Sequence, residues 1–169
     1  KTNKNIYLRR ENITINMEFE LLADSIKKIN NKAGNAAKSA VNQLLTLRNW
    51  AIGYYIVEYE QGGSDRAEYG TRLLRNLENE ISERGMNVTL FKACRRFYLQ
   101  YPQIGSTVSN QFNLPNFEKS STASNLFVTD PEQLINNLSF SHIREIMVLE
   151  DSFERFFYET ECIKCNWSV

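Results

Sequence analysis

Residues 87–101 of this chain read NVTLFKACRRFYLQY, and this stretch decides how the rest of the sequence is interpreted. At about 100° per residue, one side of the helix that it predicts is apolar or aromatic. That side consists of Leu90, Phe91, Ala93, Cys94, Phe97, Tyr98 and Tyr101. The opposite side carries the cations, which are Lys92, Arg95 and Arg96. We therefore expect a helix with one buried face and one purely cationic face, closed by Pro102.

The chain just before this stretch predicts a second helix and a turn between the two. That helix should begin at the capping box of Asp65 and Glu68, span Arg66 to about Arg84, and stop at Gly85. Asn87 can then cap the cationic helix. Two helices joined by a turn of about three to four residues that contains glycine are typical of a helix-turn-helix. In that motif the second helix enters the major groove of DNA.

Two helical segments are expected nearer the N-terminus, behind a polar, flexible tail over residues 1–16. Apolar residues recur at three- and four-residue steps over 18–31, as in an amphipathic helix: Phe19, Leu22, Ile26 and Ile29. Residues 36–61 should form one long helix that ends at Gly62-Gly63. Its segment Trp50–Val57 is apolar nearly all round and must be covered on several sides. The cover is either the rest of the chain or a second subunit, so a homodimer through Trp50–Val57 is one alternative.

Residues 103–129 differ in character from the segments around them. They contain Ser, Thr, Asn and scattered Phe with no clear period. We expect a long polar loop over 103–129, with a short β-hairpin, such as a wing, as the alternative. The expected fold class is all-α, a helical bundle that contains a helix-turn-helix, within a single domain over 17–169.

Three shorter helices are predicted after that loop, each from a capping residue. Asp130 followed by Pro131 predicts the first, which should end near residue 137. Ser141 predicts the cap of a helix that reaches about residue 149. Asp151 with Glu154 predicts the cap of a last helix that reaches about residue 165.

The charge of the chain is unevenly distributed. The formal net charge is zero, which is a poor match to a protein held mainly by the nucleic-acid backbone. Residues 64–101, however, hold seven basic groups and five acids, whereas 130–169 hold three basic groups and eight acids. No apolar run is long enough for a membrane span, so no membrane partner and a cytoplasmic location are expected.

Few residues have the pattern of a catalytic or metal site. Cys162 and Cys165 have ligand spacing, but a structural zinc needs four ligands, and only Cys94 and His142 could complete the set. We interpret the cysteines as ordinary thiols and His142 as a packing or capping residue. The sequence contains neither a phosphate-binding glycine loop nor an acid two residues before a lysine, which a metal-dependent nuclease would require. No cofactor, no metal and no catalytic residue are expected in this chain.

The order of several short motifs resembles the N-terminal domain of YhcG-type proteins, the family of domain of unknown function 1016. The motifs are Trp50-x-Ile52-Gly53, Arg66-Ala67-x-Tyr69-Gly70, Arg95-x-Phe97-Tyr98, Leu138-Ser139-Phe140-Ser141-His142, Arg155-x-Phe157-Tyr158 and Trp167-Ser168-Val169. Proteins of this family resemble two-part molecules, in which a helical domain precedes a PDDEXK-type nuclease domain. The resemblance implies that the nuclease domain, a partner in the full-length protein, is missing from this chain.

Two functions are compatible with these patterns. The leading hypothesis is a DNA-binding or DNA-positioning domain that is not catalytic by itself. Its candidate DNA contacts are Arg84, Thr89, Lys92, Arg95 and Arg96. The alternative is a helical oligomerisation or protein-docking module, which the zero net charge and the apolar stretch Trp50–Val57 favour.

Overall fold

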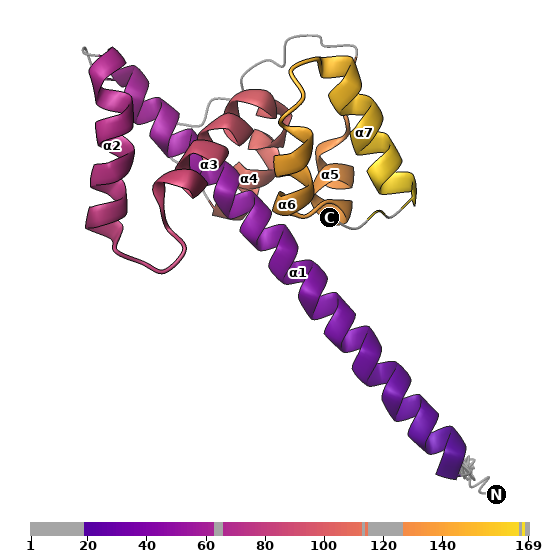
Figure 1. Cartoon of the computed structure of the whole chain (residues 1–169). Helices are drawn as coiled ribbons and strands as arrows, with labels where there is room; N and C mark the ends of the chain where they lie inside the picture. Colours follow the sequence, from indigo (N-terminus) through magenta and orange to yellow (C-terminus); the bar gives the residue numbers. More distant parts are fainter. Residues whose placement is uncertain (1–18, 63–65, 113, 115–126, 166, 168–169) are drawn as a thin grey trace, which may run out of the picture. The chain divides into compact units, whose positions relative to one another are not determined.

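Every element of the described chain is helical. The computed structural model describes residues 19–62, 66–112, 114, 127–165 and 167 (Figure 1). Within these residues there is no strand, and the all-α fold class is confirmed. The elements are α1 (Phe19–Gly62), α2 (Arg66–Ile81), α3 (Val88–Gln100), the 3-10 turn η1 (Pro102–Ile104), α4 (Gly105–Phe112), α5 (Pro131–Asn137), α6 (Phe140–Ile146) and α7 (Ser152–Cys165). The predicted tail over 1–16 lies outside the described residues.

The chain divides into two compact units, Lys1–Ala37 and Lys38–Val169. The described part of the first unit is the N-terminal segment of α1. The second unit holds the rest of α1 and all other helices. The division falls inside α1, so it does not mark a linker between two domains. The single domain over 17–169 stays a prediction.

Helix α1 runs without interruption from Phe19 to Gly62 (Figure 1), so the prediction of two separate helices was wrong. The residues that seemed to separate them include Gly34 but no proline. One interior glycine costs a helix only about 1 kcal/mol relative to alanine, and alanines flank this one closely on both sides. The helix ends at Gly62, in agreement with the predicted glycine pair, of which Gly63 lies outside the described residues.

The apolar stretch Trp50–Val57 of α1 forms the centre of the core in the second unit. The Trp50 side chain is completely buried, and its Nε1 donates a hydrogen bond to the carbonyl oxygen of Tyr101 over 2.8 Å. The Trp50 ring meets the ring of Tyr98 edge-on, with centroids 5.0 Å apart. The predicted need for cover is thus confirmed, and the chain itself covers most of the stretch. A homodimer through Trp50–Val57 stays a prediction, for which Tyr55, half-exposed, is the main side chain still accessible.

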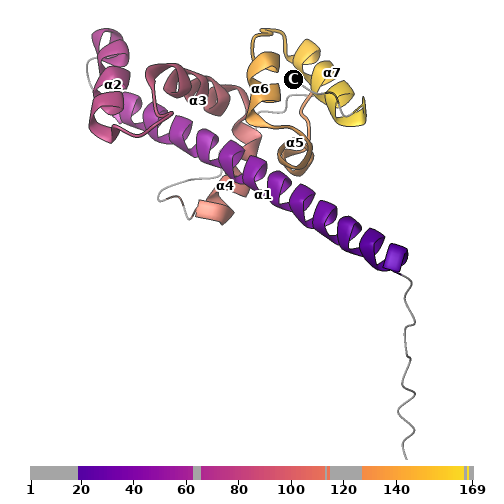
Figure 2. The same ribbon diagram turned by 60° about the horizontal axis from the view of Figure 1, so that its bottom comes forward.

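Helices α1 and α3 lie side by side (Figure 2), and their backbones come into contact at Gly53. A β-carbon at Gly53 would overlap the carbonyl oxygen of Cys94, and it would lie 2.6 Å from the carbonyl carbon and 2.9 Å from Cβ of Tyr98. A backbone carbonyl cannot move aside as the end of a flexible side chain can. Glycine at this position therefore fixes how closely α3 lies on α1.

The connection between α2 and α3 is longer than predicted. Helix α2 ends at Ile81 rather than near Arg84, because Ser82 already has a positive φ of 48°. Gly85 also has a positive φ, of 89°, which suits a glycine, and α3 begins only at Val88. The two helices contact each other through a small apolar cluster centred on Leu74 and Phe91. The order of helix, turn and helix is present, and its use as a DNA-binding motif stays a prediction.

The polar segment after Pro102 is partly helical, so the expected loop over 103–129 was wrong for its first third. Residues 102–104 form η1 and residues 105–112 form α4. Ile104 of η1, Val108 of α4 and the following Leu114 are buried. Short helices rich in Ser, Thr and Asn give little periodic signal, because few apolar residues are needed to anchor them. No strand occurs in the described parts of this segment, and residues 113 and 115–126, where a wing was the alternative, lie outside them.

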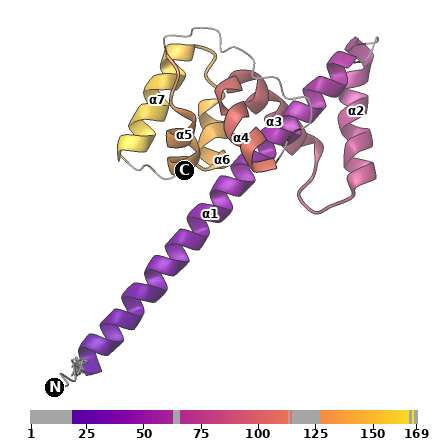
Figure 3. The same cartoon turned by 180° about the vertical axis from the view of Figure 1, so that it is seen from behind.

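Helices α5, α6 and α7 complete the second unit, and α7 packs on the other two (Figure 3). The predicted caps of the first and last are confirmed: Asp130 Oδ1 accepts from the Gln133 amide over 3.0 Å, and Asp151 Oδ1 from the Glu154 amide over 2.9 Å. The cap of α6 is Ser139 rather than the predicted Ser141. Two serines precede the same apolar run, and the backbone extends at Ser139, which makes that residue the cap.

Candidate nucleic-acid interface

Helix α3 has the two faces that its sequence predicted. Phe91, Cys94 and Phe97 are buried, whereas Lys92, Arg95 and Arg96 are exposed. The predicted cap is confirmed as well, since Asn87 Oδ1 accepts from the Leu90 amide over 2.9 Å. The Cys94 contact with Gly53 holds the buried face on α1, so the cationic face points away from the core. The two-faced helix is therefore confirmed.

The remaining candidates lie close by along the chain. Thr89 is exposed in the first turn of α3, three residues before Lys92. Residues at three- and four-residue steps share one helix face, so Thr89, Lys92 and Arg96 form one row. Arg84 is exposed in the connection between α2 and α3. Thr89 and the cations of α3 thus share one exposed face, and Arg84 precedes it in the chain.

One of the cations is engaged with α1. Arg95 Nε lies 2.7 Å from Glu60 Oε2, with the Arg95 side chain 45% exposed and the Glu60 side chain 20% exposed. An ion pair this exposed contributes little to folding, about 1 kcal/mol or less. It does, however, offset part of the positive charge of the face and hold Arg95 in one direction. No local pattern predicts this pair, because the two residues are 35 positions apart.

A second acid of α1 lies on the same side of α3. Tyr98 Oη donates to Glu58 Oε1 over 3.3 Å, and burial, followed by the nearby Glu58 charge, raises the pKa of Tyr98. The edge of α3 that faces the end of α1 is therefore bordered by carboxylates. Lys92 and Arg96 make no ion pair within the described part of the chain. They are the cations of α3 whose charge no carboxylate of the described chain offsets through an ion pair.

Two further cations lie near α3 that sequence analysis did not single out. Burial raises the pKa of the Cys94 thiol to about 12, while the guanidinium groups of Arg48 and Arg144 act in the opposite direction. Both groups must be near Cys94 to do so, one on α1 and the other on α6, which contacts α3. Arg48 also donates to Asn49 Oδ1, and Arg144 is exposed. Neither belongs to a basic run, so only the packing of three helices brings them together.

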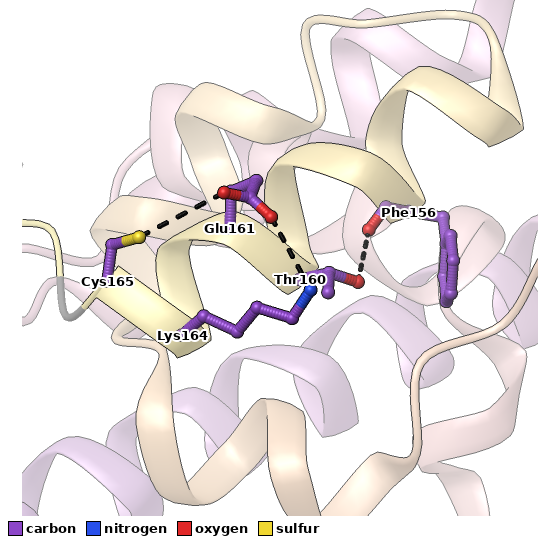
Figure 4. A network of polar contacts seen from close by, with 5 residues as sticks. All are labelled: Phe156, Thr160, Glu161, Lys164 and Cys165. Atoms are coloured by element: carbon purple, nitrogen blue, oxygen red, sulfur yellow. Dashed lines mark hydrogen bonds and ion pairs between the residues drawn. The ribbon is translucent and has the colours of Figure 1, made fainter.

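The three cysteines of the chain are free thiols. Cys94 is buried, and this burial raises the pKa of its thiol and disfavours the thiolate form. Cys165 on α7 lies 4.0 Å from Glu161 Oε2, and Lys164 pairs with the other oxygen over 3.6 Å (Figure 4). Within the described residues, no three His, Cys, Asp or Glu side chains gather as metal ligands would. The contacts in Figure 4 are short-range links along one helix, typical of a solvated surface.

His142 is a capping residue, as predicted. Its Nδ1 accepts a hydrogen bond from the Ser139 backbone amide over 3.2 Å, which with the Ser139 hydroxyl completes a capping box. Its Nε2 lies 2.9 Å from the carbonyl oxygen of Trp167, which requires the proton to be on Nε2. Both ring nitrogens therefore have structural partners.

A buried carboxylate was missed by sequence analysis. Glu159 of α7 accepts hydrogen bonds from Tyr101 Oη over 2.6 Å and from the Thr129 hydroxyl. Burial raises the pKa of Glu159, and these two bonds together with the nearby Arg155 charge act against that rise. The three groups tie the end of α3 to α7 and to the segment before α5. Their role is structural, since Glu159 is almost fully buried.

An apolar groove of about 720 Å³ lies between α1 and α2, next to the N-terminal part of α3. Its lining includes Ile52, Tyr55, Tyr59, Leu73, Leu77 and Phe91. Glu58 is the charged residue in this lining. A groove of this composition suits an apolar surface better than a nucleic acid.

Comparison with known proteins shows the family to which the chain belongs. The described helices include none with the length and hydropathy needed to cross a bilayer. The family model for the DUF1016 N-terminal domain matches residues 25–169. The chain is 28% identical over 160 residues to a protein of Escherichia coli (strain K12) named "Putative nuclease YhcG", and this match covers 89% of the chain and 42% of that protein. The chain thus spans less than half the length of this relative, and no solved structure matches it. The resemblance drawn from the short motifs is confirmed, and the chain belongs to the DUF1016 N-terminal domain family.

Proposed function

We propose that this chain is a DNA-binding domain that positions a nuclease domain on its substrate through the exposed face of α3. The observation that carries the proposal is the row of Lys92 and Arg96, exposed and without an ion-pair partner in the described chain. Such a row on a capped helix suits phosphate contacts on either side of a groove. Arg84 adds a third cation from the connection before the helix.

The arrangement around α3 supports a rigid docking element. The backbone contact at Gly53 and the hydrogen bond from Trp50 to Tyr101 fix the helix at its middle and at its end. Arg95 is held by Glu60 through Nε, and an arginine has four further N–H groups that can meet phosphate or a base edge. Thr89 offers a hydroxyl in the first turn, where the helix dipole also favours an anion.

The number of free cations sets the expected strength of binding. Each phosphate contact lowers the slope of log K against log salt by about 0.9, so Arg84, Lys92 and Arg96 predict a slope of about −3. Binding should therefore be modest and strongly weakened by salt. A modest affinity is sufficient for a positioning role, because a tethered nuclease domain would cleave the DNA and make further contacts with it.

We assign the hydrolysis of DNA to a separate nuclease domain and not to this one. The Escherichia coli relative, which is named a putative nuclease, is more than twice as long as the region that matches this chain, so it has room for a separate catalytic domain. Metal-dependent hydrolysis of a phosphodiester needs carboxylates gathered around an ion. Several acids of the described chain have structural contacts instead: Asp151 caps a helix, Glu159 forms the buried bridge, and Glu161 pairs with Lys164 on the surface.

A second candidate function is protein docking, and the apolar groove between α1 and α2 favours it. The two functions differ in their response to salt. Binding of a protein segment in this groove depends on apolar contact and should change little with salt, whereas DNA binding should fall steeply.

The test is fluorescence anisotropy of a labelled DNA duplex titrated with the chain at several salt concentrations. The double variant Lys92→Glu with Arg96→Glu should bind at least about tenfold more weakly at low salt, with a flatter salt slope. The matched control is Lys38→Glu with Lys164→Glu, which changes the net charge equally on α1 and α7. Equal losses in both variants would mean that only net charge matters, and unchanged affinity in the α3 variant would refute the proposal.

A further inference from the structure

The first segment of α1 carries apolar side chains that the described chain leaves exposed. Phe19 is 82% exposed, and Ile26 and Ile29 are 58% and 69% exposed. Most helices in proteins are stabilised by packing of their apolar face rather than by helix propensity alone. A helical segment with such a face uncovered is therefore suited to bind another apolar helix.

The spacing of these residues is that of a two-helix seam. Apolar residues follow one another in alternating steps of three and four, at Phe19, Leu22, Ile26, Ile29, Ala33 and Ala36. This spacing defines the a and d positions of a coiled coil. The residues beside the seam are mostly small or uncharged: Ala23, Ser25, Asn30 and Ala37, with Lys32 as the exception. Small neighbours allow two helices to approach closely along the roughly 28 Å of the segment.

We propose that this segment, Phe19–Ala37, pairs in antiparallel orientation with the same segment of a second copy of the chain. The seam has large side chains at its beginning and alanines at its end. An antiparallel pair places large residues opposite small ones, so that its layers are Phe19 with Ala36, Leu22 with Ala33, and Ile26 with Ile29. A parallel pair would oppose Phe19 to Phe19 and Ala36 to Ala36, which crowds one end and leaves gaps at the other.

The charges of the segment favour the same orientation. The acids Glu20 and Asp24 lie in its first turns, and the cations Lys27, Lys28 and Lys32 lie later. In an antiparallel pair, the acidic end of one helix lies beside the basic end of the other. Lys32, which flanks the seam, then comes near the turn that holds Asp24 of the second copy. A parallel pair would align acids with acids and lysines with lysines.

Pairing of the two segments does not depend on DNA binding. The paired residues all belong to the first unit, and none lies on α3. The double variant Lys92→Glu with Arg96→Glu should therefore associate as the unmodified chain does, so failure of one proposal leaves the other standing.

The first experiment is sedimentation velocity of the whole chain over a concentration series. The unmodified chain should shift from monomer to dimer, and Ile26→Glu, in the middle of the seam, should remain monomeric. The matched control is Leu21→Glu, which places the same charge on a 56% exposed leucine outside the seam and should leave the dimer intact. Circular dichroism of both variants checks that the helix persists.

The second experiment tests orientation by disulfide formation, with Cys162→Ser and Cys165→Ser as background. A mixture of the Leu22→Cys and Ala33→Cys chains should cross-link under mild oxidation, and each chain alone should cross-link far less. The proposal is overturned if the unmodified chain stays monomeric at all concentrations, or if Ile26→Glu associates normally. It is also overturned if Leu22→Cys alone cross-links as readily as the mixture.

Discussion

Two segments of α1 share one pattern of apolar residues but differ in what covers them. Phe19, Leu22, Ile26 and Ile29 follow steps of three, four and three, and so do Leu47, Trp50, Tyr54 and Val57. The first set is exposed, whereas the second is buried by the rest of the chain. Periodicity therefore predicts that a helix has an apolar face, but not whether that face meets the same chain or another.

Composition separates the two segments more clearly than periodicity does. The buried segment contains Trp50, Tyr54 and Gly53, that is, large aromatic side chains beside a site of backbone contact. The exposed segment has one aromatic residue, Phe19, and otherwise mixes aliphatic residues with alanines and lysines. Aromatic side chains bury the largest areas, so several of them close together around a glycine mark the segment around which the core forms.

The largest expected effect is at the centre of the buried segment. Trp50→Ala should lower the free energy of unfolding by about 3–5 kcal/mol, because it leaves a cavity and removes the donor to the Tyr101 carbonyl. Ile26→Ala, in the exposed segment, should change it by no more than about 0.5 kcal/mol when the chain is dilute and monomeric. Urea unfolding followed by circular dichroism measures both. Similar losses in the two variants would remove the distinction between the segments.

A smaller effect is expected where α1 touches α3. Gly53→Ala should cost about 1–3 kcal/mol, since the new methyl group meets the backbone of Cys94 and forces the helices apart. The same change should weaken DNA binding, because it moves the cationic face relative to the core. A variant as stable as the unmodified chain would show that the close approach of the two helices is not required.

What the sequence predicts well about this fold is local. The caps at Asn87, Asp130 and Asp151 each involve an acceptor and an amide three residues apart, and all three were predicted correctly. The two faces of α3 were also correct, since 3.6-residue periodicity is a local property. The choice between Ser139 and Ser141 failed because both positions satisfy the same local pattern.

What the sequence predicts poorly depends on pairs distant along the chain. Glu60 reaches Arg95 across 35 positions, and Glu159 reaches Tyr101 across 58. No local pattern marks either glutamate, and a helical period assigns both only to a face. The exposed positions of Lys92, Arg95 and Arg96 on α3 were therefore predicted correctly, while the acids beside them come from the packing of α1 against α3.

The buried polar bridge gives a prediction for pH dependence. Tyr101, which packs in the same core as Trp50, donates to Glu159, whose pKa is raised by burial. Between the ordinary pKa of a glutamate and this raised value, the folded chain holds more protons than the unfolded chain. Stability should therefore fall as pH rises through that range.

The measurement is urea unfolding over a pH series, with Glu159→Gln as the test variant. Glutamine cannot ionise, so the decline over this range should be smaller in the variant than in the unmodified chain. Only a difference in pH dependence between the two proteins would assign the decline to Glu159. A loss of stability that is the same at every pH would reflect only the altered hydrogen bonds of the glutamine. Equal declines in the two proteins would assign the pH dependence to other groups.

The smallest expected effect has the opposite sign and concerns the other interior glycine of α1. A β-carbon at Gly34 would meet nothing within 4 Å, and its φ is not in the left-handed region. Gly34→Ala should therefore stabilise the local helix by about 1 kcal/mol through helix propensity alone. Residue 34 follows the seam position Ala33 and lies outside the proposed pairing face, so dimer formation should be retained. Amide hydrogen exchange should show slower exchange over residues 30–37 in this variant, with little change around Trp50. Faster exchange over residues 30–37 would mean that the chain needs a glycine at position 34. Packing would then not explain why alanine is expected to be tolerated at position 34 but not at position 53.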